Sequence, residues 1–136
     1  MMRSIWIHFL AGAVFLILIS SCATVPSEPL SPGELRLLNL QVESAGSVIR
    51  DSLIQVKVIF EAEGRPELRK ACFYWSEAGP YCTQIKDVSW GSPSLFVTWI
   101  RSGKAGVYNL VGYIEYLRDG TPRASNKVST SVSVAY

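Results

Sequence analysis

Alternation of apolar and polar residues is the feature that most constrains the fold of this chain. Residues 53–62, 107–117 and 126–136 each carry apolar side chains at nearly every second position. A period of two residues places these side chains on one face of an extended strand, whereas a helix needs a period of about 3.6. No stretch after residue 33 shows a helical stripe, so we expect an all-β fold.

Turn-forming residues divide the folded part, predicted as residues 34–136, into about seven strands. Within the first, Leu38, Leu40 and Val42 are expected to share one face. The predicted strands span 35–43, 53–62, 68–76, 81–87, 94–101, 107–117 and 126–136.

The last two strands carry a family resemblance. Tyr108 follows Gly106 at the start of a strand, and its alternate positions continue apolar to Tyr116. This resembles the tyrosine corner of immunoglobulin-like and fibronectin-III-like domains, in which the phenol hydroxyl bonds to upstream backbone. Residues 118–122 then form a predicted turn in which Gly120 can take positive φ. The resemblance implies a single two-sheet sandwich.

The amino-terminal segment has the three parts of an export signal. Arg3 supplies positive charge, Ile5 to Ile19 form an apolar run interrupted by His8, and Ser20 and Ser21 follow. Fifteen residues in a helix span roughly 22 Å, which is short of the roughly 30 Å hydrocarbon core of a membrane. A signal peptide is therefore favoured over a transmembrane helix.

Ile19-Ser20-Ser21-Cys22 resembles the lipobox of bacterial lipoproteins, in which leucine is commoner than Ile19 at the first position. The resemblance implies a signal peptide of residues 1–21, cleavage before Cys22, and two or three acyl chains that anchor Cys22 to a membrane. It further implies the outer membrane in an organism with two membranes, because Ala23 replaces the aspartate that retains lipoproteins at the inner one. Ordinary secretion with nearby cleavage is the alternative.

Residues 22–33 are predicted to be the lipidated cysteine and a proline-rich tether. Pro26, Pro29 and Pro32 recur at every third position, which favours an extended polyproline-like backbone. Residues 23–33 at about 3.1 Å each reach roughly 34 Å from the lipid.

The remaining two cysteines fall in one predicted hairpin. Cys72 lies directly opposite Cys82 if Glu77 is at the centre of the turn, and Phe73 then faces Tyr81. Because an exported protein meets an oxidising compartment, we expect a Cys72–Cys82 disulfide. An antibody-type domain instead joins its two sheets by a disulfide, so this pair departs from the resemblance.

The sequence offers no catalytic or cofactor-binding motif. The single histidine, His8, lies in the signal segment, so neither histidine catalysis nor a zinc site built from two thiols is expected. No phosphate-binding loop is present, and the net charge of +2 gives no support to nucleic-acid binding. We expect no metal, no cofactor and no enzymatic activity; a carboxylate pair brought together from distant strands, as in a hydrolase, is the enzymatic alternative.

Aromatic side chains are the candidates for a binding surface. Trp75 and Trp99 alternate in phase with apolar neighbours and are predicted to be core residues. Tyr74 lies on the opposite face from Trp75, and Trp90 lies beside Gly91 in a loop. Tyr74 and Trp90 are therefore the candidate binding residues, and stacking on sugar rings is one use of such side chains.

The lipobox resemblance implies a lipid-anchored module of the bacterial cell envelope, and by elimination we expect it to be non-enzymatic and to contact another envelope protein. The chain consists of an anchor, a tether and one small fold, and no reactive constellation is left over. The alternatives are a carbohydrate- or peptidoglycan-binding module that uses exposed aromatic residues, and the carboxylate-based hydrolase.

Replacing the lipobox cysteine tests the anchor. A Cys22→Ala variant lacks the sulfur that would carry the diacylglycerol, so the protein is expected to leave the membrane fraction and to keep its signal segment. Fractionation and intact-mass measurement check both. Membrane attachment equal to that of the wild type would contradict the anchor.

Overall fold

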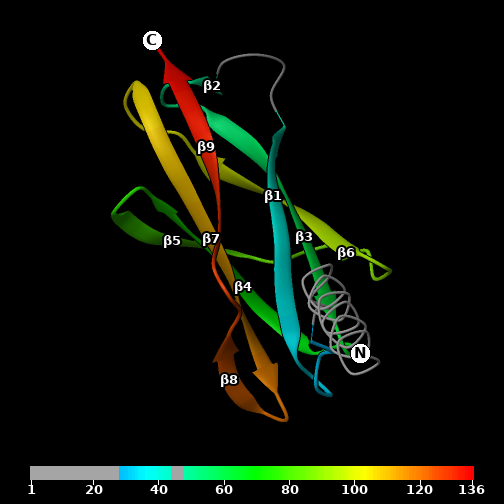
Figure 1. Ribbon diagram of the computed structural model, residues 1–136. Coiled ribbons are helices and arrows are strands. Elements are labelled where there is room, and N and C mark those ends of the chain that lie inside the picture. Colours follow the sequence, from blue (N-terminus) through cyan, green and yellow to red (C-terminus); the bar gives the residue numbers. More distant parts are fainter. Residues whose placement is uncertain (1–27, 44–47) are drawn as a thin grey trace, which may run out of the picture.

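The computed structural model describes residues 28–43 and 48–136 (Figure 1). The predicted signal peptide, Cys22 and the first part of the predicted tether lie outside the described residues. Nine strands are described: β1 (Leu35–Glu43), β2 (Val48–Ile49), β3 (Leu53–Ala62), β4 (Glu67–Trp75), β5 (Ala78–Gln84), β6 (Ser94–Arg101), β7 (Gly106–Arg118), β8 (Thr121–Ala124) and β9 (Val128–Ala135). Within these ranges no helix has the length and apolarity needed to cross a membrane.

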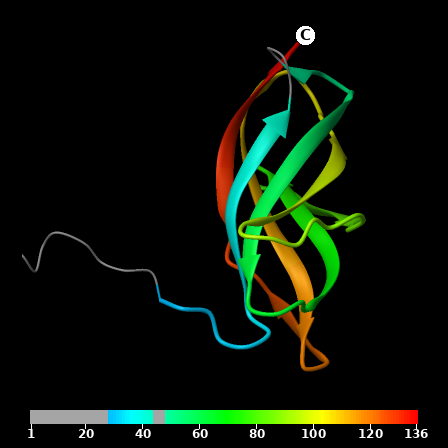
Figure 2. The same ribbon diagram turned by 90° about the vertical axis from the view of Figure 1, so that its right-hand side faces the viewer.

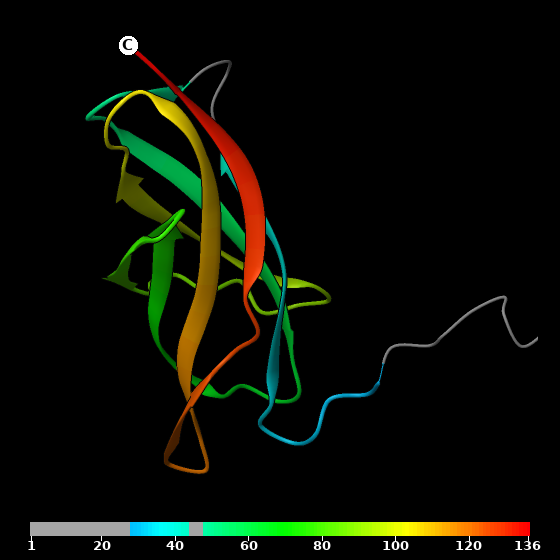
Figure 3. The same cartoon turned by 60° about the vertical axis from the view of Figure 1, so that its left-hand side comes forward.

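Two sheets pack face to face, as predicted. The smaller sheet has the order β1-β3-β6, and the larger has the order β2-β9-β7-β4-β5 with β8 paired to β7. The smaller sheet is in front in Figure 2 and the larger sheet in Figure 3. All pairings are antiparallel except the short parallel pairing of β2 with β9. The fold is an all-β two-sheet sandwich.

The alternating residues form the core between the sheets. The inward side chains of β3 are Ile54, Val56, Val58 and Phe60, and all are buried. From the larger sheet, Phe73 of β4 and Leu110 of β7 pack against them as part of one cluster. Removing such side chains from water contributes about 1.5–3 kcal/mol each to folding, so this face holds the two sheets together.

The bounds of β1, β3 and β6 are those predicted, whereas β2 and β8 were not anticipated. β2 has only two residues and thus no pattern. β8 begins inside the predicted turn, because Asp119 and Gly120 both take positive φ (51° and 76°) and close a tight hairpin. The following residues then pair with the end of β7.

Leu38 was predicted to share a face with Leu40, and the structure corrects this. A bulge between Leu37 and Asn39 shifts the alternation, so that Leu37 and Leu40 are buried and Leu38 is 43% exposed. The Asn126 side chain fills the bulge: its Oδ1 accepts from the Leu37 N–H at 2.8 Å and its Nδ2 donates to the Leu37 carbonyl at 2.9 Å. Asn126 thereby ties the edge of the smaller sheet to the larger one.

Trp99 was predicted to be a core residue, and this is wrong. Phe96 and Ile100 of β6 face the core, which leaves Trp99 on the opposite face with 54% of its surface exposed. Both faces of β6 carry apolar residues, so alternation alone did not decide which face is buried. Trp75, by contrast, is buried as predicted.

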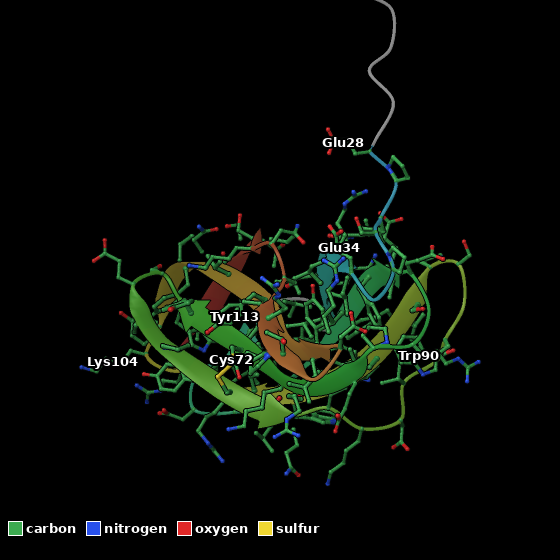
Figure 4. All side chains as sticks on the ribbon, turned by 90° about the horizontal axis from the view of Figure 1, so that it is seen from below. Glu28, Glu34, Cys72, Trp90, Lys104 and Tyr113 are labelled. Carbon is green, nitrogen blue, oxygen red and sulfur yellow. A yellow bond between two sulfur atoms is a disulfide. The ribbon has the colours of Figure 1, made fainter. Side chains whose placement is uncertain are left out.

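The predicted hairpin register is confirmed. Cys72 pairs with Cys82 and Phe73 with Tyr81, and the two cysteine sulfur atoms lie 2.10 Å apart, at disulfide distance. The bond lies on the outer face of the larger sheet, beside Tyr113 (Figure 4). The hairpin is thus closed at the strand that forms one edge of the molecule.

Removing the Cys72–Cys82 bond tests its contribution to stability. Closing a loop of this length stabilises a fold by about 2.8 kcal/mol through the entropy of the unfolded chain. The double variant Cys72→Ala/Cys82→Ala is expected to lose about that much free energy of unfolding in denaturant titrations. Wild-type protein under reducing conditions is the control, and an unchanged midpoint in both would contradict the bond.

Candidate functional site

The larger sheet extends beyond the smaller one at β5. At one side of the sandwich, β1 of the smaller sheet contacts β9 of the larger sheet. At the other side, the smaller sheet ends at β6, whereas the larger sheet continues past β4 to β5. Paired residues share a face, so Tyr81 of β5 faces the same side as its partner Phe73. Phe73 is 1% exposed and Tyr81 is 57% exposed. The inner face of β5 is therefore uncovered at Tyr81.

A groove of about 710 Å³ lies along this uncovered face. Its walls come from β4 and β5 on one side, and from β6 with the residues that follow it on the other. Its aromatic lining residues are Phe73, Trp75, Tyr81, Trp99 and Tyr108, and Ala78 and Ile100 add aliphatic surface. Its charged lining residues are Asp51, Arg101 and Lys104. The groove therefore combines an aromatic lining with a rim that carries more positive than negative charge.

Side-chain contacts hold the groove in shape. The Trp75 and Tyr108 rings meet edge to face with their centroids 5.5 Å apart. The Tyr108 hydroxyl donates to the Lys104 carbonyl at 2.8 Å, which is the bond expected of a tyrosine corner. Further along, the hydroxyls of Thr83 on β5 and Thr98 on β6 are 2.8 Å apart and link the two sheets. The groove is thus preformed by contacts within the sandwich.

The basic residues at the rim are not neutralised by carboxylates. The ion pairs found among the described residues join Arg36 to Glu61, Lys57 to Glu43 and Arg69 to Glu67. Arg101 instead donates to the backbone carbonyl of Asp51 at 3.2 Å, and Lys104 is exposed. Both cations are therefore available to an anionic group at this end of the groove.

One edge of β6 presents unused backbone groups. The N–H and C=O of Leu95 both bond to Ser89, on the side away from β3. Because backbone groups alternate sides along an antiparallel strand and the β3–β6 register is unbroken, those of Val97, Trp99 and Arg101 also point away from β3. Within the described part of the chain, no strand pairs with β6 on that side.

Tyr74, the first candidate binding residue, lies elsewhere. It is on the outer face of the larger sheet, where its ring centroid is 6.2 Å from that of Tyr113. The Lys127 ammonium lies over both rings, at 5.4 and 5.9 Å. Removal from water raises the pKa of the Tyr113 hydroxyl above its ordinary value, and Tyr74 and Glu115 raise it further. This pair already has a cation stacked on it.

Trp90, the second candidate, is half-buried and packs against the hydrophobic core. Its ring meets Phe60 edge to face at 5.7 Å, and the Arg65 guanidinium lies 5.8 Å from the ring centroid. Figure 4 shows Trp90 at the right of the molecule, well separated from Tyr113. The structure does not bring Tyr74 and Trp90 together, and neither lines the groove.

Sequence reasoning missed Tyr81 and Trp99 as surface residues. The hairpin register located Tyr81 correctly, but no sequence signal says that nothing covers β5. Potential metal ligands also cluster at Cys72, Cys82 and Glu115. The two sulfur atoms are bonded to each other, so this set provides no thiolate to a metal.

No protein-family model, curated protein or solved structure matches the chain. The structure shows an all-β two-sheet sandwich and the Tyr108 hydrogen bond, and the immunoglobulin-like resemblance stays a prediction from the sequence. The groove and the open edge of β6 are the observations that bear on function.

Two tryptophan variants separate packing from surface exposure. Trp90→Ala removes a ring that packs on Phe60, so the free energy of unfolding is expected to fall by about 2 kcal/mol. Trp99→Ala removes an exposed ring and is expected to change it by less than about 0.5 kcal/mol. Denaturant titration measures both, and the reverse order of effects would show that the two environments are misassigned.

Proposed function

We propose that this chain is a lipid-anchored, non-enzymatic module of the bacterial cell envelope that binds another protein through the groove between β5 and β6. The observation that carries this proposal is Tyr81, which faces inward but is 57% exposed above the groove. Exposed aromatic side chains with arginine nearby are typical of the residues that dominate the binding energy of protein interfaces. Trp99 and Arg101 complete that combination here.

The position of the tether supports an orientation in which the groove faces away from the membrane. The described part of the tether contacts the end of β7, where the Arg118 Nε donates to the Pro32 carbonyl at 3.1 Å. Lys104 lies just before the start of β7, at the end of this strand that is far from Arg118. The thirteen residues of β7 span roughly 40 Å. A lipid on Cys22 would therefore leave the rim of the groove distant from the bilayer.

The composition of the groove favours binding over hydrolysis. Asp51 is the only carboxylate among its lining residues, whereas glycoside hydrolysis uses two carboxylates about 5 to 10 Å apart. Glycan binding is favoured less than protein binding, because Lys127 already covers the Tyr74–Tyr113 pair and Trp90 is partly occupied by core packing.

Site-specific photocrosslinking in living cells tests this function. A benzophenone amino acid replaces Tyr81 or Trp99 in the full-length protein, and the control replaces Leu38, which is also exposed but lies on the opposite edge of the smaller sheet. We expect one and the same protein to crosslink at the two groove positions and not at Leu38.

Mass spectrometry identifies the crosslinked species after purification in mild detergent. Equal capture at all three positions would show a surface without specificity, and crosslinks to cell-wall glycan alone would assign the groove to glycan binding. Either result, or the absence of crosslinks, would contradict the proposal.

A further inference from the structure

The geometry points to a specific mode of binding at this groove: an extended segment of the partner adds to the smaller sheet as a strand beside β6, with acidic side chains at the end that meets Arg101 and Lys104. This inference rests on the proposed function and specifies its ligand. It places the added strand where constant-type immunoglobulin sandwiches carry a fourth strand in this sheet. In the described part of this chain, that place is not filled by a strand.

The first support is the open edge of β6. The backbone N–H and C=O groups of Val97, Trp99 and Arg101 face outward, and Ser89 closes the edge at Leu95. From Val97 to Arg101 the edge spans about 13 Å, which suits a segment of about five residues. Main-chain hydrogen bonds to such an edge supply affinity in strand addition.

The second support is the excess width of the larger sheet. A strand added beside β6 would lie about 4.8 Å from it. Beyond the point where Thr98 of β6 contacts Thr83 of β5, this strand would extend over the uncovered face of β5 at Tyr81. Every second side chain of the added strand would then enter the groove above Tyr81 and Trp75. The segment would thus cover apolar surface that the chain itself leaves uncovered.

The third support is a difference between the two open edges. The Cα atoms of Cys72 and Cys82 are 4.1 Å apart, which marks a pair without mutual backbone hydrogen bonds, so the backbone of Cys82 faces the open edge of β5. Pro80, two residues earlier in the same edge strand, has no N–H to donate. Proline at this position protects the edge of β5 against pairing, and the edge of β6 has no such residue from Val97 to Arg101.

The charges near the open edge of β6 favour an acidic segment of a partner over a second copy of this chain. Lys86 joins Trp99 in a second hollow next to the groove, so cations lie near both ends of the open edge. Two copies of this chain, paired edge to edge, would bring these like charges together. A segment with acidic residues beside Arg101 and Lys104 would complement them.

Selection from a random peptide library tests the inference. Twelve-residue peptides displayed on phage are selected against the full-length lipidated protein in mild detergent. We expect the enriched peptides to share alternating apolar residues with acidic residues at one end. Amide exchange of the wild-type protein is then followed by NMR with one enriched peptide, and exchange is expected to slow at Val97, Trp99 and Arg101.

Three variants refine the result. Val97→Pro removes an outward N–H and is expected to weaken peptide binding by about tenfold or more. Lys104→Glu is expected to weaken it by about tenfold, whereas Arg123→Glu on β8 is a matched control that leaves binding unchanged. Because the exchange measurement uses the wild type, a failure of Val97→Pro to fold does not affect it.

Several results would overturn strand addition. Strand addition is contradicted if the enriched peptides do not slow exchange at the amides of Val97, Trp99 and Arg101. It is also contradicted if the library yields no binder, or if the enriched peptides lack acidic residues. Dimers of the wild type that dissociate in Val97→Pro would assign the edge to a second copy. If cells that express a correctly folded Val97→Pro variant still give the crosslinks at positions 81 and 99, the proposal of protein binding stands and strand addition fails. If the wild type gives no crosslinks at all, the proposed function itself fails.

Discussion

The apolar face of β3 has to be covered by a second sheet, and the rest of the structure depends on how that cover is made. A sheet that carries Val56, Val58 and Phe60 on one face is stable only when those side chains leave water. The larger sheet supplies the cover through β4, β7 and β9. The same sheet also includes β5, which contributes no buried residue to the core. The groove is the space left over at that strand.

Polar contacts between the sheets determine where the sandwich is closed and where it is open. At one edge, Asn126 occupies the bulge in β1 and satisfies both backbone groups of Leu37. At the opposite edge, a single hydroxyl pair, Thr83 with Thr98, bridges β5 and β6. One edge is therefore closed by the Asn126 side chain. At the other edge, the Thr83–Thr98 hydroxyl pair and the Ser89–Leu95 backbone pair hold part of β6, and the groove lies beyond them.

Alternation predicted the strands well where one face is clearly apolar, as in β3 and β7. It failed at Leu38, because a bulge changes the phase without any mark in the residue pattern, and at Trp99, because β6 is apolar on both faces. The candidate site was the less predictable part. Tyr74 and Trp90 are aromatic residues in plausible surface positions, yet their surroundings depend on Tyr113, Lys127 and Phe60, which come from distant segments.

Local pattern alone determined the all-β class, the β4–β5 register with its cysteine pair, and the tyrosine corner. Each of these depends on residues within one strand or one hairpin, whose relative positions the chain connectivity already restricts. Tertiary structure decided which strands are edges, which face of β6 is buried, and that Tyr81 has nothing above it. Those properties depend on the relative width and placement of two sheets built from residues far apart in the chain, and no local period encodes them.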